Sequence, residues 1–91
     1  MEKQMSDLSF IKNYRNRQVI LNYYMDEDLL WKRDGFNFNS ISIDEAFILF
    51  LKNDGEISIS IKEYPTFIQP SDFQNYFILL NDTNRLEIYF P

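Results

Sequence analysis

The chain has 91 residues and a net charge of −5, with sixteen Phe, Tyr and Trp residues but neither Cys nor His. The missing thiol and imidazole exclude disulfide bonds and remove the side chains most often used as metal ligands, nucleophiles and general bases. The length predicts a single domain, residues 1–91. The longest apolar run, residues 46–51, is far shorter than the roughly 20 residues of a membrane-spanning helix.

Charge is distributed unevenly along the chain. Residues 1–25 carry four basic and two acidic side chains, whereas residues 26–91 carry five basic and twelve acidic ones. A macromolecule attracted by this charge would be basic and would approach the later part of the chain. We therefore expect a protein partner, with no direct contact to nucleic acid or to a membrane. Because the polar N-terminus leads into no apolar segment, we expect a cytoplasmic location.

The first predicted element is a short helix over residues 6–16. Ser6 is a suitable N-cap, and Leu8 and Ile11 would lie on one face of the helix. Over residues 17–25 the apolar side chains follow a period of two, which is typical of a strand. Both faces of this strand are mostly apolar, so we expect it to lie in the interior of a sheet.

Two short strands, residues 29–32 and 36–39, are predicted on either side of a turn at residues 33–35. The apolar pattern slips by one position after Phe38. A bend near residues 39–40 is therefore needed to keep the apolar residues on both sides of it inside the protein.

The clearest local signal is a hairpin over residues 47–61, with a three-residue loop that ends at Gly55 in a positive-φ conformation. Such a loop places Leu49 opposite Ile59 and makes one face of the hairpin wholly apolar, which stabilises the strand pair. A helix that begins near Asp44 is the alternative, because the apolar run is too short for its period to decide.

A second hairpin is predicted over residues 76–90, with the loop at residues 82–84 and Leu80 opposite Leu86. Together these elements predict an α+β fold: a mainly antiparallel β-sheet of five to seven strands, rich in hairpins, with one short N-terminal helix.

The densest cluster of charge is Asp26-Glu27-Asp28, which follows Tyr24 and precedes Trp31. Aromatic side chains dominate the energetics of protein interfaces and carboxylates at the rim steer a basic partner, so we interpret this segment as a docking patch. The alternative is a solvated acidic turn whose aromatic neighbours face the core. The full set of predicted partner-binding residues is Tyr24, Asp26, Glu27, Asp28, Trp31, Asp34, Asp44 and Glu45.

The same carboxylates do not predict a metal site or a catalytic pair. Asp26 and Asp28 have the first spacing of a calcium-binding loop, but Trp31 stands where that loop needs Gly, and no Glu closes the motif. We therefore expect no metal, no cofactor and no enzymatic activity. The one basic stretch, residues 12–17, is interpreted as a solvated helix face.

Small size, acidity and the lack of catalytic side chains are together typical of protein-binding inhibitors. We expect a cytoplasmic inhibitor that occludes a basic, nuclease-like active site, most simply a bacterial toxin immunity protein. Its partner would be a toxin or another nucleic-acid-processing enzyme. Three alternatives stay open: a phage-encoded anti-defence inhibitor that mimics nucleic acid, a structural or oligomerisation module that pairs with copies of itself, and a small nucleic-acid-binding regulator that uses residues 12–17.

Overall fold

The computed structural model describes residues 2–5, 9–26, 29–70 and 75–91, and shows a chain built mainly from antiparallel β-strands. The elements of this part of the chain are β1 (Glu2–Met5), η1 (Ser9–Asn13), β2 (Arg17–Met25), β3 (Leu29–Phe38), β4 (Ser40–Ile43), β5 (Phe47–Lys52), β6 (Gly55–Ser60), η2 (Ile61–Glu63), β7 (Thr66–Pro70), β8 (Tyr76–Leu80) and β9 (Asn84–Tyr89). The strands form a six-stranded sheet in the order β1-β7-β8-β9-β2-β3 and a three-stranded sheet in the order β4-β5-β6. The prediction of mainly antiparallel β-structure is confirmed, but the described residues form nine strands in two sheets instead of five to seven strands in one.

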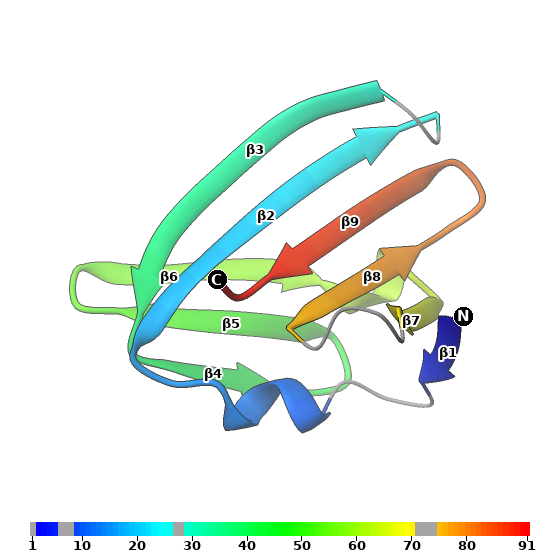
Figure 1. Ribbon diagram of the computed structural model, residues 1–91. Helices are drawn as coiled ribbons and strands as arrows, with labels where there is room; N and C mark the ends of the chain where they lie inside the picture. Colours follow the sequence, from blue (N-terminus) through cyan, green and yellow to red (C-terminus); the bar gives the residue numbers. More distant parts are fainter. Residues whose placement is uncertain (1, 6–8, 27–28, 71–74) are drawn as a thin grey trace.

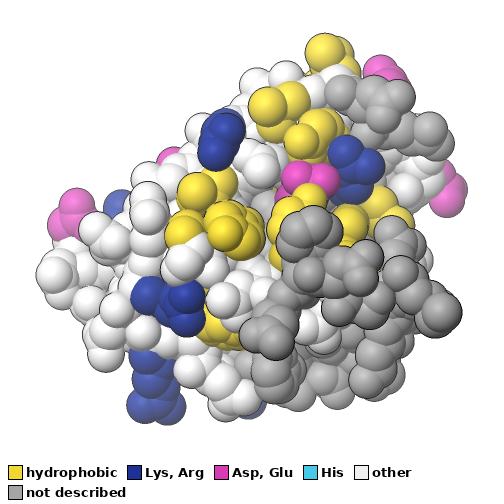
Figure 2. Space-filling view, viewed as in Figure 1, with side chains coloured by type: hydrophobic (Ala, Val, Ile, Leu, Met, Phe, Trp, Pro, Cys, Tyr) yellow, Lys and Arg dark blue, Asp and Glu magenta, His cyan; other side chains and the backbone are white. Residues whose placement is uncertain are grey.

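The two sheets form two layers. The three-stranded sheet lies behind the six-stranded sheet in Figure 1, and its strands cross those of the larger sheet at an angle. The opposite face of the larger sheet, which we call the outer face, is turned toward the viewer in Figures 1 and 2, and there no further layer of described residues covers β2, β9 and β8.

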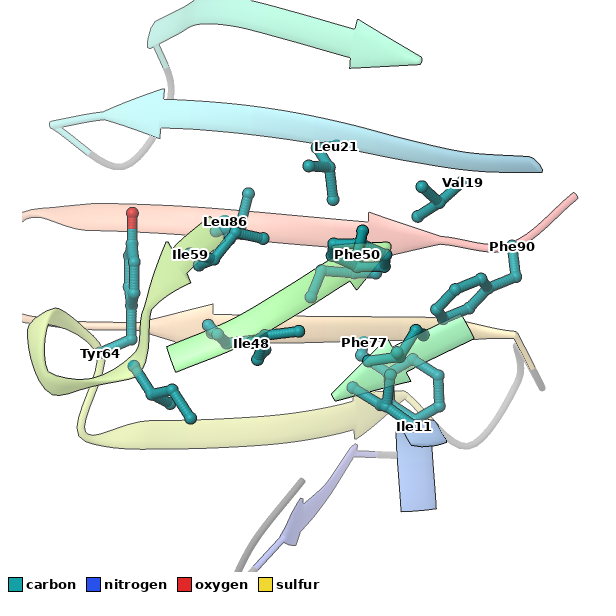
Figure 3. Packing of buried hydrophobic residues seen from close by; sticks show 14 of the residues in the cluster. Ile11, Val19, Leu21, Ile48, Phe50, Ile59, Tyr64, Phe77, Leu86 and Phe90 are labelled. Atoms are coloured by element: carbon teal, nitrogen blue, oxygen red, sulfur yellow. The ribbon is translucent and has the colours of Figure 1, made fainter. Parts of the chain in front are cut away.

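The hydrophobic core lies between the two layers. In Figure 3 the side chains of Ile48, Phe50 and Ile59 from the smaller sheet lie against those of the larger sheet. The fully buried side chains of the larger sheet include Val19, Leu21, Phe77, Leu79, Leu86 and Ile88. Burial of these apolar surfaces is the main force that holds the two sheets together.

The described residues do not show the predicted N-terminal α-helix. Among the described residues of this segment, Ser9–Asn13 form a 3₁₀ turn and Glu2–Met5 form a strand that pairs with β7. The Tyr14 N–H donates a hydrogen bond to the Ile11 carbonyl at 3.1 Å, which is the three-residue spacing of a 3₁₀ turn. Ile11 is nevertheless buried as expected for the apolar side of this segment.

The strand predicted over residues 17–25 is confirmed, and it pairs on both sides, with β3 and with β9. The predicted turn at residues 33–35 is wrong. Strand β3 continues through these residues because its pairing with β2 extends from Phe38 to Leu29. The chain reverses direction between Asp26 and Leu29 instead, and Asp26 has a φ of 49°.

The predicted bend near residues 39–40 is confirmed. The chain leaves the larger sheet after Phe38 and enters the smaller one at Ser40. At the bend, the Asn39 carbonyl accepts a hydrogen bond from the Asn16 N–H at 3.0 Å. The Asn39 N–H donates a hydrogen bond to the Leu51 carbonyl at 2.7 Å. These bonds satisfy the backbone polar groups where the chain passes between layers.

The first hairpin is a pair of strands, which decides against the alternative helix, but its register differs from the predicted one by one residue. Lys52 lies opposite Gly55 and Leu49 opposite Ser58, so the loop has two residues. The side chain of Asn53 accepts a hydrogen bond from the Asn39 amide at 2.7 Å, which ties the loop to the bend. Because a one-residue slip exchanges the faces of a strand, Phe50 rather than Leu49 is fully buried.

The second hairpin shows the same difference. Leu80 lies opposite Arg85 instead of Leu86, and the loop again has two residues. The Asn81 side-chain oxygen accepts hydrogen bonds from the N–H groups of Thr83 and Asn84 at 2.9 and 2.6 Å, and this local arrangement fixes the tight turn. As a result Leu79 and Leu86 face each other inside the core.

Candidate functional site

The end of the β2–β3 hairpin carries the largest group of exposed apolar side chains in the described part of the chain. This group, called the hairpin patch, consists of Met25, Leu29, Leu30 and Trp31. Trp31 is 54% exposed and Leu29 is 58% exposed. A group of large apolar side chains on the surface of a small domain is a candidate contact surface.

Trp31 lies in the first half of the edge strand β3, where residues 29–33 are all exposed, and the strand pairing beside it is irregular. The register between β2 and β3 shifts between Tyr23 and Tyr24, and Trp31 therefore has no direct partner on β2. Its ring lies 5.6 Å from the Tyr23 ring, and the Lys32 ammonium lies 5.2 Å from the centroid of that same ring. Tyr23 thus supports Trp31 on one side, while more than half of the indole surface remains available to a partner.

The structure places one residue of the predicted acidic cluster. Asp26 is exposed and follows Met25 of the hairpin patch directly. Its positive φ is a conformation that Asp tolerates better than most residues, which suits the point where the chain leaves β2. Glu27 and Asp28 lie outside the described residues. The hairpin patch therefore has a carboxylate at its border.

Tyr24 and Asp34 lie on opposite faces of the larger sheet. Tyr24 is opposite Leu30 and belongs to the outer face, where the guanidinium carbon of Arg85 lies 4.3 Å from its ring centroid. Asp34 is opposite Leu21 and belongs to the face that carries the core. Burial raises the pKa of Tyr23, and the negative charge of Asp34 adds to that rise. Tyr24, Asp26 and Trp31 are thus brought to one hairpin end, with Asp34 further along β3.

Asp44 and Glu45 lie in the other sheet, in the turn between β4 and β5. The Asp44 carboxylate accepts hydrogen bonds from the N–H groups of Ala46 and Phe47 at 2.7 and 2.8 Å. These two bonds lower the pKa of Asp44. Asp44 therefore shapes its turn, and the structure does not bring this pair together with the hairpin patch.

A polar group on the outer face was not anticipated from the sequence. Glu87 is only 9% exposed; its carboxylate lies 3.3 Å from Nε of Arg85 and accepts a hydrogen bond from the Tyr76 hydroxyl. The alternation of Arg85, Glu87 and Tyr89 is the signal that could have shown it, because alternate residues of a strand share a face. The predicted register concealed the group because it placed Leu80, and with it Tyr76, on the core face opposite Leu86, away from Glu87.

Two hollows lie on the surface of the described residues. One, of about 260 Å³, is on the outer face and is lined by Ile20, Asn22, Arg33, Tyr76 and Tyr89. The other, of about 280 Å³, is lined by Asn13, Tyr14, Arg15 and Arg17. In Figure 2 the outer face shows hydrophobic side chains gathered between Lys or Arg groups and one acidic group.

Comparisons with protein-family models, with curated proteins and with solved structures gave no match for this chain. Within the described residues, no helix has both the length and the apolar character needed to cross a membrane. The same part of the chain contains no cluster of three or more Asp or Glu side chains arranged to hold a metal ion.

Proposed function

We propose that this chain is a protein-binding inhibitor that holds a basic partner through the hairpin patch. The observation that carries the proposal is the joint exposure of Trp31 and three aliphatic side chains beside Asp26. Trp is among the residues that most often dominate the free energy of binding, and its neighbours exclude water around it. A carboxylate at the border of the patch contributes to the speed and specificity of association.

The charge of the chain supports a basic partner. Residues 26–91 carry twelve acidic and five basic side chains, and this segment contains three of the four residues of the hairpin patch. Enzymes that process nucleic acids bind phosphates and therefore have basic active sites. Occlusion of such a site needs no catalytic group on the inhibitor. The proposed role is that of a toxin immunity protein, in the cytoplasm, and no enzymatic activity of its own is proposed.

The position of β3 favours a partner over a second copy of the chain. Strand β3 is at one edge of the larger sheet, and edge strands can pair with another chain. In an antiparallel pair of identical strands, the residue at the two-fold axis lies opposite its own copy. With Lys32 or Asp34 at that axis, self-pairing would bring like charges together, whereas with Arg33 there the like pair would be flanked by Lys32 opposite Asp34.

Site-specific photocrosslinking tests the proposal. A photoreactive phenylalanine analogue is placed at Trp31 in one variant and at Phe47 in a control variant, because Phe47 is a comparable exposed aromatic residue (43% exposed) on the other sheet. In the source cell we expect the variant at residue 31, and not the control, to capture a basic enzyme that the purified chain also inhibits.

Capture of the same protein from both positions, or of an enzyme whose activity is unaffected by the chain, would contradict the proposal. The identity of the captured enzyme distinguishes the two inhibitor roles, because an immunity protein binds a toxin and an anti-defence protein binds an enzyme of the host.

A further inference from the structure

The hollow on the outer face is a second surface, separate from the hairpin patch. Its lining residues belong to two adjacent cross-strand rows of the larger sheet. In one row Asn22 lies between Arg33 of β3 and Glu87 of β9, and in the next Ile20 lies between Gly35 and Tyr89, with Tyr76 beyond Tyr89. Since residues directly opposite one another point to the same face, these rows form one continuous surface. The hollow is therefore built from β3, β2, β9 and β8 together.

The side-chain amide of Asn22 has no hydrogen-bond partner in the described part of the chain. Its oxygen is buried, and the structure gives the amide nitrogen no partner there either. An unpaired amide in the interior of a sheet lowers stability, and buried polar groups of this kind call for an explanation. Binding sites are where such local conflicts are expected, since a ligand supplies the missing bonds.

Among the described side chains, the charges that face this surface are Arg33, Arg85 and Glu87. Arg85 and Glu87 lie 3.3 Å apart, and the Tyr76 hydroxyl also donates to Glu87, so this pair is neutralised within the protein. Arg33 is exposed and has no hydrogen bond or ion pair with the described residues. The available charge beside Asn22 is therefore a guanidinium, and it lies on the β3 side, away from the Glu87 carboxylate.

The remaining walls are apolar. Ile20 is part of the lining, and the rings of Tyr76 and Tyr89 lie with centroids 6.3 Å apart at an angle of 50°. Gly35 has no side chain, so the row of Ile20 is open toward β3. The volume of about 260 Å³ is below the roughly 300–1,000 Å³ of sites for drug-sized ligands. This size fits an occupant of about one amino-acid residue.

We propose that the hollow on the outer face binds an N-acylated amino acid with a large apolar side chain, either as a small molecule or as the last residue of a peptide. The ligand carboxylate pairs with the Arg33 guanidinium, a geometry that allows two parallel hydrogen bonds. The ligand amide supplies both a donor and an acceptor to the amide of Asn22. Its side chain rests against Ile20 and the two tyrosine rings. This inference does not rest on the proposed function.

A nucleotide fits these observations less well. The hollow is small, the chain has a net charge of −5, and Arg33 is the one unpaired cation among the described residues of this surface. Nucleic-acid sites combine several cations with stacking rings, because each phosphate must be neutralised. One carboxylate needs only one guanidinium.

N-acetyl-L-phenylalanine is the probe for a titration followed by two-dimensional NMR. We expect saturable shifts centred on Asn22 and Arg33, with a dissociation constant of about 1 mM or lower. N-acetyl-L-phenylalaninamide lacks the carboxylate and should bind at least about tenfold more weakly. A tetrapeptide that ends in phenylalanine with a free carboxylate distinguishes a small-molecule ligand from the C-terminal residue of a peptide. Equal or tighter binding of the tetrapeptide assigns a peptide terminus, and weaker binding assigns a small molecule.

Three variants test the assignment of the site. Arg33→Gln removes the cation, Asn22→Val removes the amide, and Gly35→Val fills the entrance. A Cβ atom at Gly35 meets only ordinary contacts of 3.9 Å, so the last variant should fold. Each should weaken binding at least about tenfold, whereas the control Arg15→Gln, on a different surface, should not. Asn22→Val should also melt at the same or a higher temperature, a result that a purely structural Asn would not give.

Absence of saturable binding by the wild-type chain would overturn the proposal. Unchanged affinity of the folded Arg33→Gln and Gly35→Val variants would overturn it equally. Tighter binding of a short single-stranded RNA than of the probe, at the same shifted residues, would replace it with a nucleic-acid site.

Discussion

The hydroxyl of Tyr76 donates a hydrogen bond to the carboxylate of Glu87, which is buried on the outer face of the larger sheet. Burial, this bond and the negative charge of Glu87 together raise the pKa of Tyr76 well above its ordinary value. Loss of the phenol proton would remove the donor and place two negative charges side by side. The fold therefore depends on the neutral form of this side chain.

Alkaline pH should destabilise the protein through its tyrosines. Burial also raises the pKa of Tyr14, Tyr23 and Tyr64. A group whose pKa is raised by folding contributes stability that is complete below its unfolded pKa and is lost above it. The free energy of unfolding should therefore fall above about pH 10. Urea denaturation between pH 7 and 11 measures this, and a flat profile would contradict the burial of these rings.

Tyr76→Phe should separate the hydrogen bond from the ring. At pH 7 the variant should lose about 1–3 kcal/mol, because the buried carboxylate of Glu87 loses a donor. Its stability should then decline less than that of the wild type above about pH 10. Tyr89→Phe, which removes an exposed hydroxyl on the neighbouring strand, is the control and should match the wild type at pH 7.

Gly55→Val should destabilise the first hairpin by about 1–3 kcal/mol. Gly55 has a φ of 145°, a conformation that a β-branched residue rarely adopts, and no atom lies within 4 Å of the position of an added Cβ. The loss would therefore come from backbone strain and not from a clash. Thermal unfolding measures it, with Gly35→Ala as the control at a strand glycine without positive φ. Equal effects at both positions would argue against the observed turn.

The register of the first hairpin can be tested by two alanine substitutions. Phe50→Ala should cost about 3–5 kcal/mol, because the ring is fully buried and packs against Phe36 and Phe38. Phe47→Ala should cost about 1 kcal/mol or less, because that side chain is exposed. In the register expected from the sequence, Phe47→Ala would cost more stability than Phe50→Ala. Chemical denaturation of the two variants therefore distinguishes that register from the observed one.

Trp31→Ala should accelerate dissociation of the partner and leave the fold intact. The indole is more than half exposed, so its loss should cost about 1 kcal/mol or less of stability. Binding kinetics with the captured enzyme should show an increased off-rate, because buried aromatic anchors act mainly on dissociation. A folded variant that dissociates at the wild-type rate would exclude Trp31 as an anchor.

Neutralising the acidic segment should slow association. In the variant Asp26→Asn, Glu27→Gln, Asp28→Asn, the on-rate should fall severalfold at low salt. It should also depend less on salt than the wild-type on-rate does. Stability should change by about 0.5 kcal/mol or less, as for most surface substitutions. Unchanged kinetics across low and high salt would identify the segment as a solvated turn without a role in binding.

The sequence predicted which segments are strands better than it predicted their register. Alternation identified β2 and both hairpins, because period two is a local property. The loop lengths depend on hydrogen bonds that are specific to the folded chain, such as that from Asn39 to Asn53. A change of one residue in each loop reversed the face of one strand in each hairpin, β5 and β8, so Phe50 and Leu79 replaced their neighbours in the core.

The candidate site was predictable in part. The position of Tyr24, Asp26 and Trp31 at one hairpin end follows from their proximity in the sequence. Trp31 is exposed together with the rest of residues 29–33, because β3 is an edge strand, and no local pattern indicates the place of a strand in its sheet. The hollow around Asn22 joins residues from four strands, and only the order of the strands in the sheet brings Arg33 and Tyr76 to one surface.

Strand β9 is the last described strand in the chain, yet it lies inside the larger sheet between β8 and β2. Until β9 is in place, β2–β3 and β7–β8 share no backbone hydrogen bonds, and each leaves a strand edge open to other chains. Joining β9 to β2 closes a loop of most of the chain, a slow step in folding. During synthesis the facing edges of β2 and β8 therefore stay unpaired until β9 has been made. In this interval the open strand edges favour aggregation most.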